Sequence, residues 1–157
     1  MFGHIITGST GGTTQLAGLK DELLRDRMVT ANAVRAVAAT VWRSGHTPAE
    51  RRLDRLTEAA AWTDAALALL EGALPSWKLR RLTYDEGEWH CALSQRRELP
   101  DWLDEAVESH HPNRAVALML AVIDALQQTV QFGRGDRGAV PRVRPIRDDL
   151  FCCENFA

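Results

Sequence analysis

Three adjacent pairs of residues could bind a metal or act as nucleophiles: His90-Cys91, His110-His111 and Cys152-Cys153. Thiolate and imidazole are ligands that zinc prefers, and a cysteine beside a histidine base is typical of thiol hydrolases. The spacing supports neither chemistry, because the sequence has no CxxC or HxxxH pattern and adjacent residues on a strand point to opposite faces. We therefore predict no metal site, no cofactor and no catalytic residue. A small Cys/His hydrolase or metal-binding protein is the third and least favoured function.

Arginine dominates the basic residues, with 17 Arg against 2 Lys in the whole chain. Guanidinium groups bind phosphate and carboxylate in a bidentate manner, so this bias could serve an anionic ligand or nucleic acid. Genome base composition explains it more simply, and few aromatic residues lie among the arginines to stack on bases. Anion or nucleic-acid binding is the second function. Its candidate residues are Arg80, Arg81, Arg96 and Arg97, together with the arginines of a basic tail between residues 134 and 147.

Five tryptophans stand out in a chain of 157 residues. Tryptophan buries a large area and needs a partner for its indole N–H, so the ordinary interpretation is an aromatic core that joins a sheet to helices. The functional interpretation is a set of anchors for a protein partner, because tryptophan is enriched at binding hot spots. The candidate interface residues are Trp62, Trp77, Trp89, Trp102 and Met119.

Length and composition are those of one globular domain. The hydrophobic fraction is 45% and the net charge is -2, so nothing draws the whole chain to nucleic acid or to an anionic membrane. The longest purely apolar run, Ala115 to Ile123, has nine residues, whereas a membrane span needs about 20. No secretory pattern opens the sequence, and three cysteines do not make a disulfide framework. We expect a cytoplasmic protein that does not enter a membrane.

The N-terminal segment divides into a flexible part and a helical part. Residues 1–15 are rich in Gly, Thr and Ser and are predicted to be flexible. From Leu16 to Arg43 leucine and valine recur at three- and four-residue steps, which indicates helix. The cluster at residues 28–30 is expected to break this stretch into two helices.

The clearest local signal is a helix start at Thr47. Thr47 and Glu50 form a capping box, and Pro48 occupies the first helical position. The helix is predicted to run about 25 residues, to Ala73, with Gly72 and Pro75 ending it.

A two-stranded β-hairpin is predicted near residues 77–94, with Glu86 and Gly87 as its loop. Tyr84 then lies opposite Trp89, and the other pairs are Leu82 with Cys91 and Arg80 with Leu93. This register places the apolar side chains on one face, which makes Cys91 a core residue. That face holds Leu82, Tyr84, Trp89, Cys91 and Leu93, and the outer face holds Leu79, Arg81, Thr83, His90 and Ala92.

The C-terminal part is predicted to contain a short helix at residues 99–107 and a longer one from Arg114 to Gln131, with Asn113 as its N-cap. The longer helix is apolar nearly all round, and such a helix is usually buried on more than one side. Because two strands alone would cover it poorly, self-association is expected. Residues 133–157 are predicted to form a flexible or extended tail.

The predicted fold class is therefore α+β and mostly α: N-terminal helices, a helix, a two-stranded hairpin, further helices and a flexible tail. Residues 16–132 form the single domain, between a flexible N-terminus at 1–15 and a tail at 133–157.

Part of the chain resembles a family. The resemblance covers residues 59–109 and is carried by the string AAWTDAALALLEGALPSWKLRRLTYDEGEWHCALS, at residues 60–94, and by LPDWLDEAVES, at residues 99–109. It is similar to short alphaproteobacterial proteins of rhizobial type, a family of unknown function, in its LPxW helix end, its YDEGEWHC turn and its LPxxLD segment. The helix–hairpin–helix order is also similar to small α/β sandwich domains of phage genes, an analogy of architecture alone. The resemblance implies no activity and no site residue.

The preferred function is a cytoplasmic, non-enzymatic interaction or regulatory protein that forms a homodimer. The expectation depends on the apolar helix at 114–131 and on a small sheet with open edges.

Overall fold

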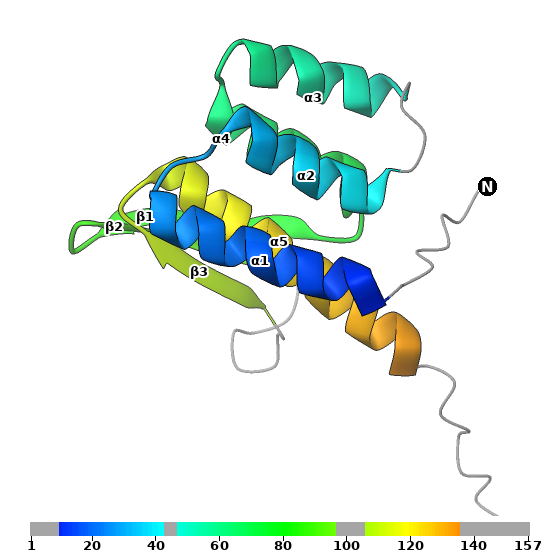
Figure 1. Ribbon diagram of the computed structural model, residues 1–157. Coiled ribbons are helices and arrows are strands. Elements are labelled where there is room, and N and C mark those ends of the chain that lie inside the picture. The colour runs from blue at the N-terminus through cyan, green and yellow to red at the C-terminus, as the bar shows by residue number, and fades with distance from the viewer. Residues whose placement is uncertain (1–9, 43–46, 97–105, 136–157) are drawn as a thin grey trace, which may run out of the picture.

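The structure is a computed structural model that describes residues 10–42, 47–96 and 106–135. The fold is α+β and mostly helical, as predicted. Figure 1 shows a small antiparallel sheet on one side of the molecule, with helices α2 (Ala31–Val41) and α3 (Pro48–Glu58) on the opposite side. Helix α5 (Arg114–Gly135) lies between these layers and forms the centre of the core.

Helix α1 (Thr10–Asp26) starts within the segment that was predicted to be flexible. Its inward residues Leu16, Leu19 and Leu23 are buried at the helical spacing that the sequence predicts. The predicted break before α2 is present. Arg27 adopts φ 57° after α1, and the Thr30 side chain caps α2 by accepting a hydrogen bond from Ala33 N at 3.2 Å.

The capping box at Thr47 is confirmed, with both of its hydrogen bonds formed and Pro48 in the first turn of α3. The single long helix predicted from this point is wrong, because the chain turns back after α3 and continues as α4 (Trp62–Ala73). Ala60 adopts the left-handed conformation with φ 52°. Ala61 N bonds to Leu56 O at 2.9 Å and Ala60 N to Thr57 O at 3.1 Å, which is a Schellman motif.

Helix α4 ends at Ala73, as the sequence predicted, and its C-cap is Leu74, which directly precedes Pro75. Gly72 lies inside the last turn of the helix. Glycine is needed there for a close approach. A Cβ atom at Gly72 would lie 2.8 Å from Cζ2 of Trp42, the residue that follows α2. The absence of a side chain at Gly72 therefore lets α2 and α4 pack together.

The sheet contains β1 (Lys78–Asp85), β2 (Glu88–Ser94) and β3 (Val107–His111) in the order β1-β2-β3, all antiparallel. The prediction of two strands missed β3. The hairpin loop is Glu86-Gly87 as predicted, and both residues have positive φ, 47° and 91°. These angles are typical of a type I′ turn.

The predicted register is correct near the loop and wrong at its far end. Tyr84 pairs with Trp89 and Leu82 with Cys91, but Leu93 pairs with Leu79 instead of Arg80. A β-bulge between Leu79 and Arg81 shifts the register, which turns Leu79 toward the core.

Helix α5 is buried along most of its length, which confirms the interpretation of its apolar surface. Residues 115–123 are all buried, and α5 packs against α1, α4, β2 and β3. Asn113 caps it as predicted, because its Oδ1 accepts a hydrogen bond from Ala115 N at 3.0 Å. Most of the short helix predicted at 99–107, and the part of the predicted tail beyond 135, lie outside the described residues. Val107 begins β3 instead of ending a helix, and residues 133–135 continue α5 instead of starting the tail.

Candidate interaction surface

Cys91 lies on the helix-covered face of the sheet and is 1% exposed. Burial raises the pKa of its thiol from 9.0 to about 12. A thiol with this pKa keeps its proton at neutral pH and is a poor nucleophile or metal ligand. Its neighbour on β3 is Ser109, whose hydroxyl donates a hydrogen bond to Ala117 O in α5 at 2.6 Å. Cys91 is therefore a small hydrophobic residue of the core.

The histidines do not gather around Cys91. His90 and His110 pair across β2 and β3 on the outer face of the sheet, where their rings stack with centroids 5.8 Å apart. His110 Nδ1 lies 2.7 Å from Glu88 Oε2. His111 is buried, and its Nδ1 accepts a hydrogen bond from Asn113 N at 2.9 Å. Among the described residues, no group of three or more His, Cys, Asp or Glu side chains is arranged to hold a metal ion.

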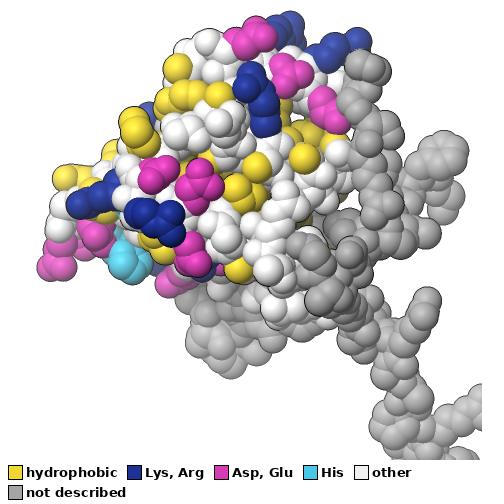
Figure 2. Space-filling view, in the orientation of Figure 1, with side chains coloured by type: hydrophobic (Ala, Val, Ile, Leu, Met, Phe, Trp, Pro, Cys, Tyr) yellow, Lys and Arg dark blue, Asp and Glu magenta, His cyan; other side chains and the backbone are white. Residues whose placement is uncertain are grey.

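The outer face of the sheet is polar and carries an exposed charge pair. Arg81 on β1 donates to Glu108 on β3 at 3.1 Å, and this pair spans Ala92 of the middle strand. Ala92 is only 2% exposed although it is on the outer face. Figure 2 shows acidic and basic side chains side by side at the hairpin end of the molecule, with hydrophobic atoms scattered among them. This view contains no broad apolar patch.

Three of the candidate arginines, Arg80, Arg81 and Arg96, lie in the part of the chain that the structure describes. Arg81 is paired with Glu108, and Arg80 is the extra residue of the β1 bulge. Arg96 follows β2, where its backbone N–H donates to Ser94 Oγ at 3.0 Å. Arg97 and the arginines of the basic tail beyond residue 135 lie outside the described residues.

The candidate interface residues divide into core and surface. Trp77 is 2% exposed and Met119 is fully buried, so neither reaches the surface of the chain. Trp62, at the start of α4, and Trp89 are half-buried. Trp102 lies outside the described residues.

An aromatic and cationic stack covers the hairpin end of the sheet on the helix side. Tyr84 and Trp89 have ring centroids 5.3 Å apart, and the Arg114 guanidinium lies 5.3 Å from the centre of the Trp89 ring. Arg114 also reaches Thr63 Oγ1 at 3.4 Å. No sequence pattern singles out Arg114, because its partners are distant in sequence and only the fold brings them together.

An open hollow of about 370 Å³ lies where the first turns of α4 and α5 meet. Its lining is mixed in charge, with Asp64 and Arg114 among its residues. The acidic and basic groups together give it no preference for one charge of ligand. The hollow is a surface feature between two helix starts.

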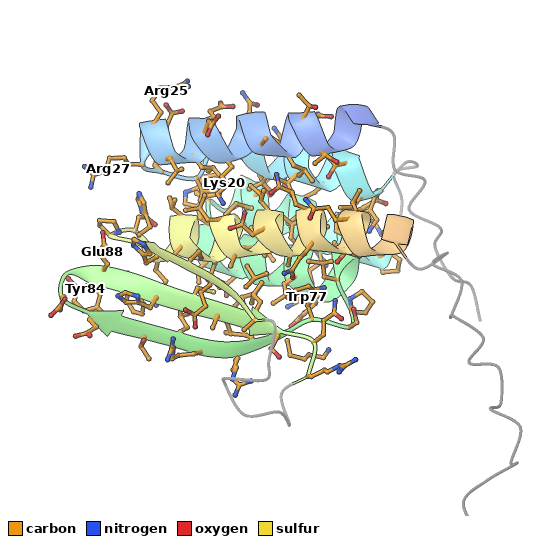
Figure 3. The ribbon with its side chains drawn as sticks, turned by 90° about the horizontal axis from the view of Figure 1, so that it is seen from below. Lys20, Arg25, Arg27, Trp77, Tyr84 and Glu88 are labelled. Atoms are coloured by element: carbon orange, nitrogen blue, oxygen red, sulfur yellow. The ribbon has the colours of Figure 1, made fainter. Side chains whose placement is uncertain are left out.

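β1 and β3 are the two edge strands of the described sheet, and β1 is the less covered by helices. Among the described strands only β2 pairs with β1, so its other edge has no strand beside it. Figure 3 shows β1 as the lower border of the sheet, with Tyr84 near its end. Helix α5 packs against β2 and β3, and the side chains of β1 are correspondingly less covered. Tyr84 is 61% exposed and Leu82 is half-buried.

Searches against protein-family models, curated proteins and solved structures find no match to this chain. The resemblance to alphaproteobacterial proteins stays a prediction. Within residues 10–42, 47–96 and 106–135, no helix is both long enough and apolar enough to cross a membrane.

Proposed function

We propose that this protein is a non-enzymatic interaction or regulatory protein that acts as a homodimer, with the outer edge of β1 as its docking element. The observation that carries the proposal is this edge. A strand without a neighbour presents a row of backbone donors and acceptors to which another strand can pair. Strand addition of this kind is a recurrent mode of protein recognition.

Apolar side chains on β1 would add contacts to the backbone hydrogen bonds that a second strand makes with it. Leu82 and Tyr84 lie on the same face as the core but beyond the cover of α5. A strand added beside them would bury the exposed part of both side chains and extend the Tyr84–Trp89 contact.

Helix α5 no longer supports a dimer. Its apolar surface led us to expect self-association, but α1, α4 and the sheet cover it within one chain. The unpaired edge of the sheet, and not the apolar surface of α5, therefore supports self-association.

The two other functions have less support. The buried, protonated thiol of Cys91 argues against thiol catalysis. Anion binding would need convergent arginines, whereas Arg81 is engaged by Glu108 on the sheet.

Light scattering over a concentration series tests the proposal. We expect the mass of the purified chain to rise from 17.5 kDa toward twice that value as the concentration reaches several hundred micromolar. Tyr84→Pro should keep the chain monomeric, because proline removes the N–H that β1 offers to a second strand. Tyr84→Val is the matched control, since it also loses the ring but keeps the N–H, and it should still dimerise. A wild-type chain that stays monomeric throughout would overturn the proposal.

A further inference from the structure

We infer that β1 pairs with β1 of a second copy in one antiparallel register, in which Thr83 lies opposite Thr83 of that copy, Leu82 opposite Tyr84, and Arg81 opposite Asp85. This inference rests on the proposed homodimer and adds its geometry. The two sheets would join into one continuous sheet across a two-fold axis that passes between the two Thr83 residues.

The hairpin determines which backbone groups of β1 face outward. In an antiparallel pair, hydrogen-bonded and non-hydrogen-bonded residue pairs alternate. The two-residue loop makes Asp85 and Glu88 a hydrogen-bonded pair, so the next hydrogen-bonded pair is Thr83 with His90. The backbone groups of Leu82 and Tyr84 therefore point away from β2. These two residues offer a second strand two donors and two acceptors.

Three antiparallel registers use these outward groups, and only one matches both apolar and charged residues. With Leu82 opposite itself, Tyr84 would face the bulged Arg80. With Tyr84 opposite itself, Leu82 would face the loop residue Glu86. With Thr83 opposite Thr83 of the second copy, Leu82 of each copy lies opposite Tyr84 of the other, and both pairs are on the helix side of the sheet.

Charge complementarity selects the same register. Basic residues occupy the first half of β1, and Asp85 ends it. Antiparallel pairing about Thr83 brings each Arg81 opposite Asp85 of the other copy, so two favourable pairs form on the outer face. Arg81 would then lie between Glu108 of its own chain and Asp85 of the second copy.

The first half of β1 is protected against pairing, which limits the interface to its second half. The bulge between Leu79 and Arg81 disrupts the regular edge, and Lys78 adds a charge. Bulges and lysines are the devices that keep edge strands from pairing. Residues 82–85 carry neither device and keep a regular register with β2. An interface this short predicts a weak dimer.

A disulfide at the two-fold axis tests the register. Thr83 would face its copy in a non-hydrogen-bonded pair with the Cα atoms about 4.5 Å apart, within the range that a disulfide bridges. In a chain carrying Cys152→Ser and Cys153→Ser, Thr83→Cys should form a covalent dimer under mild oxidation. The control is His90→Cys, which lies opposite Thr83 on β2 of the same sheet face and should stay monomeric under the same conditions.

A charge exchange gives a second measurement that does not depend on cysteine chemistry. Asp85→Arg alone would place like charges opposite each other twice and should weaken dimerisation about tenfold. Adding Arg81→Asp restores opposite charges between the copies and should recover most of the affinity. Circular dichroism and a single unfolding transition establish that each variant is folded.

The outcomes separate this inference from the proposed function. A dimer by light scattering, without Thr83→Cys cross-linking and without the charge exchange effect, overturns the register and leaves the homodimer. A monomeric wild-type chain overturns both. If the chain stays monomeric and its β1 edge pairs with a strand of a different protein, the inference that a second copy occupies this edge is wrong.

Discussion

Trp77 and Thr129 are 52 residues apart in the sequence and are joined by a hydrogen bond of 3.1 Å from the indole Nε1 to Oγ1. Trp77 is 2% exposed and precedes β1, while Thr129 lies in the second half of α5. Thr129 Oγ1 also donates to Ala125 O at 2.8 Å. One hydroxyl therefore links the residue that precedes β1 to the backbone of the central helix.

Replacing Thr129 by valine should destabilise the protein by about 1–3 kcal/mol, because the buried indole N–H would lose its partner. Urea unfolding measures the difference. Thr129→Ser keeps the hydroxyl and is the control, with a smaller expected loss. Equal stability of the two variants would show that the hydrogen bond contributes nothing.

Alanine substitutions at two helical glycines should act in opposite directions. At Gly72 a Cβ atom would lie 2.8 Å from the Trp42 ring, so Gly72→Ala should cost about 1 kcal/mol after the gain in helix propensity. At Gly18 on α1 nothing lies within 4 Å of that position, so Gly18→Ala should stabilise by about 0.5–1 kcal/mol. Thermal unfolding compares the two variants. A stabilised Gly72→Ala variant would refute the close approach of Trp42.

Glycine at position 60 should stabilise the turn between α3 and α4. Ala60 adopts φ 52°, a conformation that costs an alanine roughly 1 kcal/mol and a glycine almost nothing. We expect Ala60→Gly to raise the free energy of unfolding by about 0.5–1 kcal/mol. Ala59 has φ −77°, so Ala59→Gly should give no gain. The same change in both variants would contradict the assignment of the left-handed position.

The stability of the protein should fall at high pH through Cys91. The folded-state pKa of about 12 exceeds the usual 9.0, so between these values the native state holds more protons than the unfolded state. The free energy of unfolding contributed by this group is therefore complete below about pH 9 and declines as pH rises toward 12, by at most about 1.4 kcal/mol per pH unit. Urea unfolding from pH 8 to about pH 11 should show a shallower decline for Cys91→Ala than for the wild type. If the free energy of unfolding fell equally with pH in both proteins, the Cys91 thiol would be exposed to water in the folded state.

The sequence predicted those features that depend on residues close together in the chain. The capping box at Thr47 and the Asn113 cap form within one helical turn, and the Glu86-Gly87 loop needs only two residues that accept positive φ. The all-round apolar surface of α5 likewise predicted its burial without any knowledge of its neighbours.

The sequence predicted only part of the candidate surface. The apolar face and the hairpin register near the loop followed from the alternation of residues. Alternation did not predict the position of Arg114 above Trp89, because that contact joins residues distant in sequence. It did not predict the bulge at Arg80 either, because a bulge shifts the register that alternation assumes.

The amino-acid sequence by itself determined where α3 and α5 start, where the hairpin turns and which helix is central, since local hydrogen bonds and side-chain period encode these. The tertiary structure alone decided that the alanine run around Ala60 breaks a helix, because α4 packs back against α3 and α5, where its residues Ala65, Leu69 and Leu70 are buried. It also decided that Val107–His111 becomes a strand, although this segment is mostly polar. Pairing with β2 and the bond from Ser109 to α5 supply what its own composition lacks.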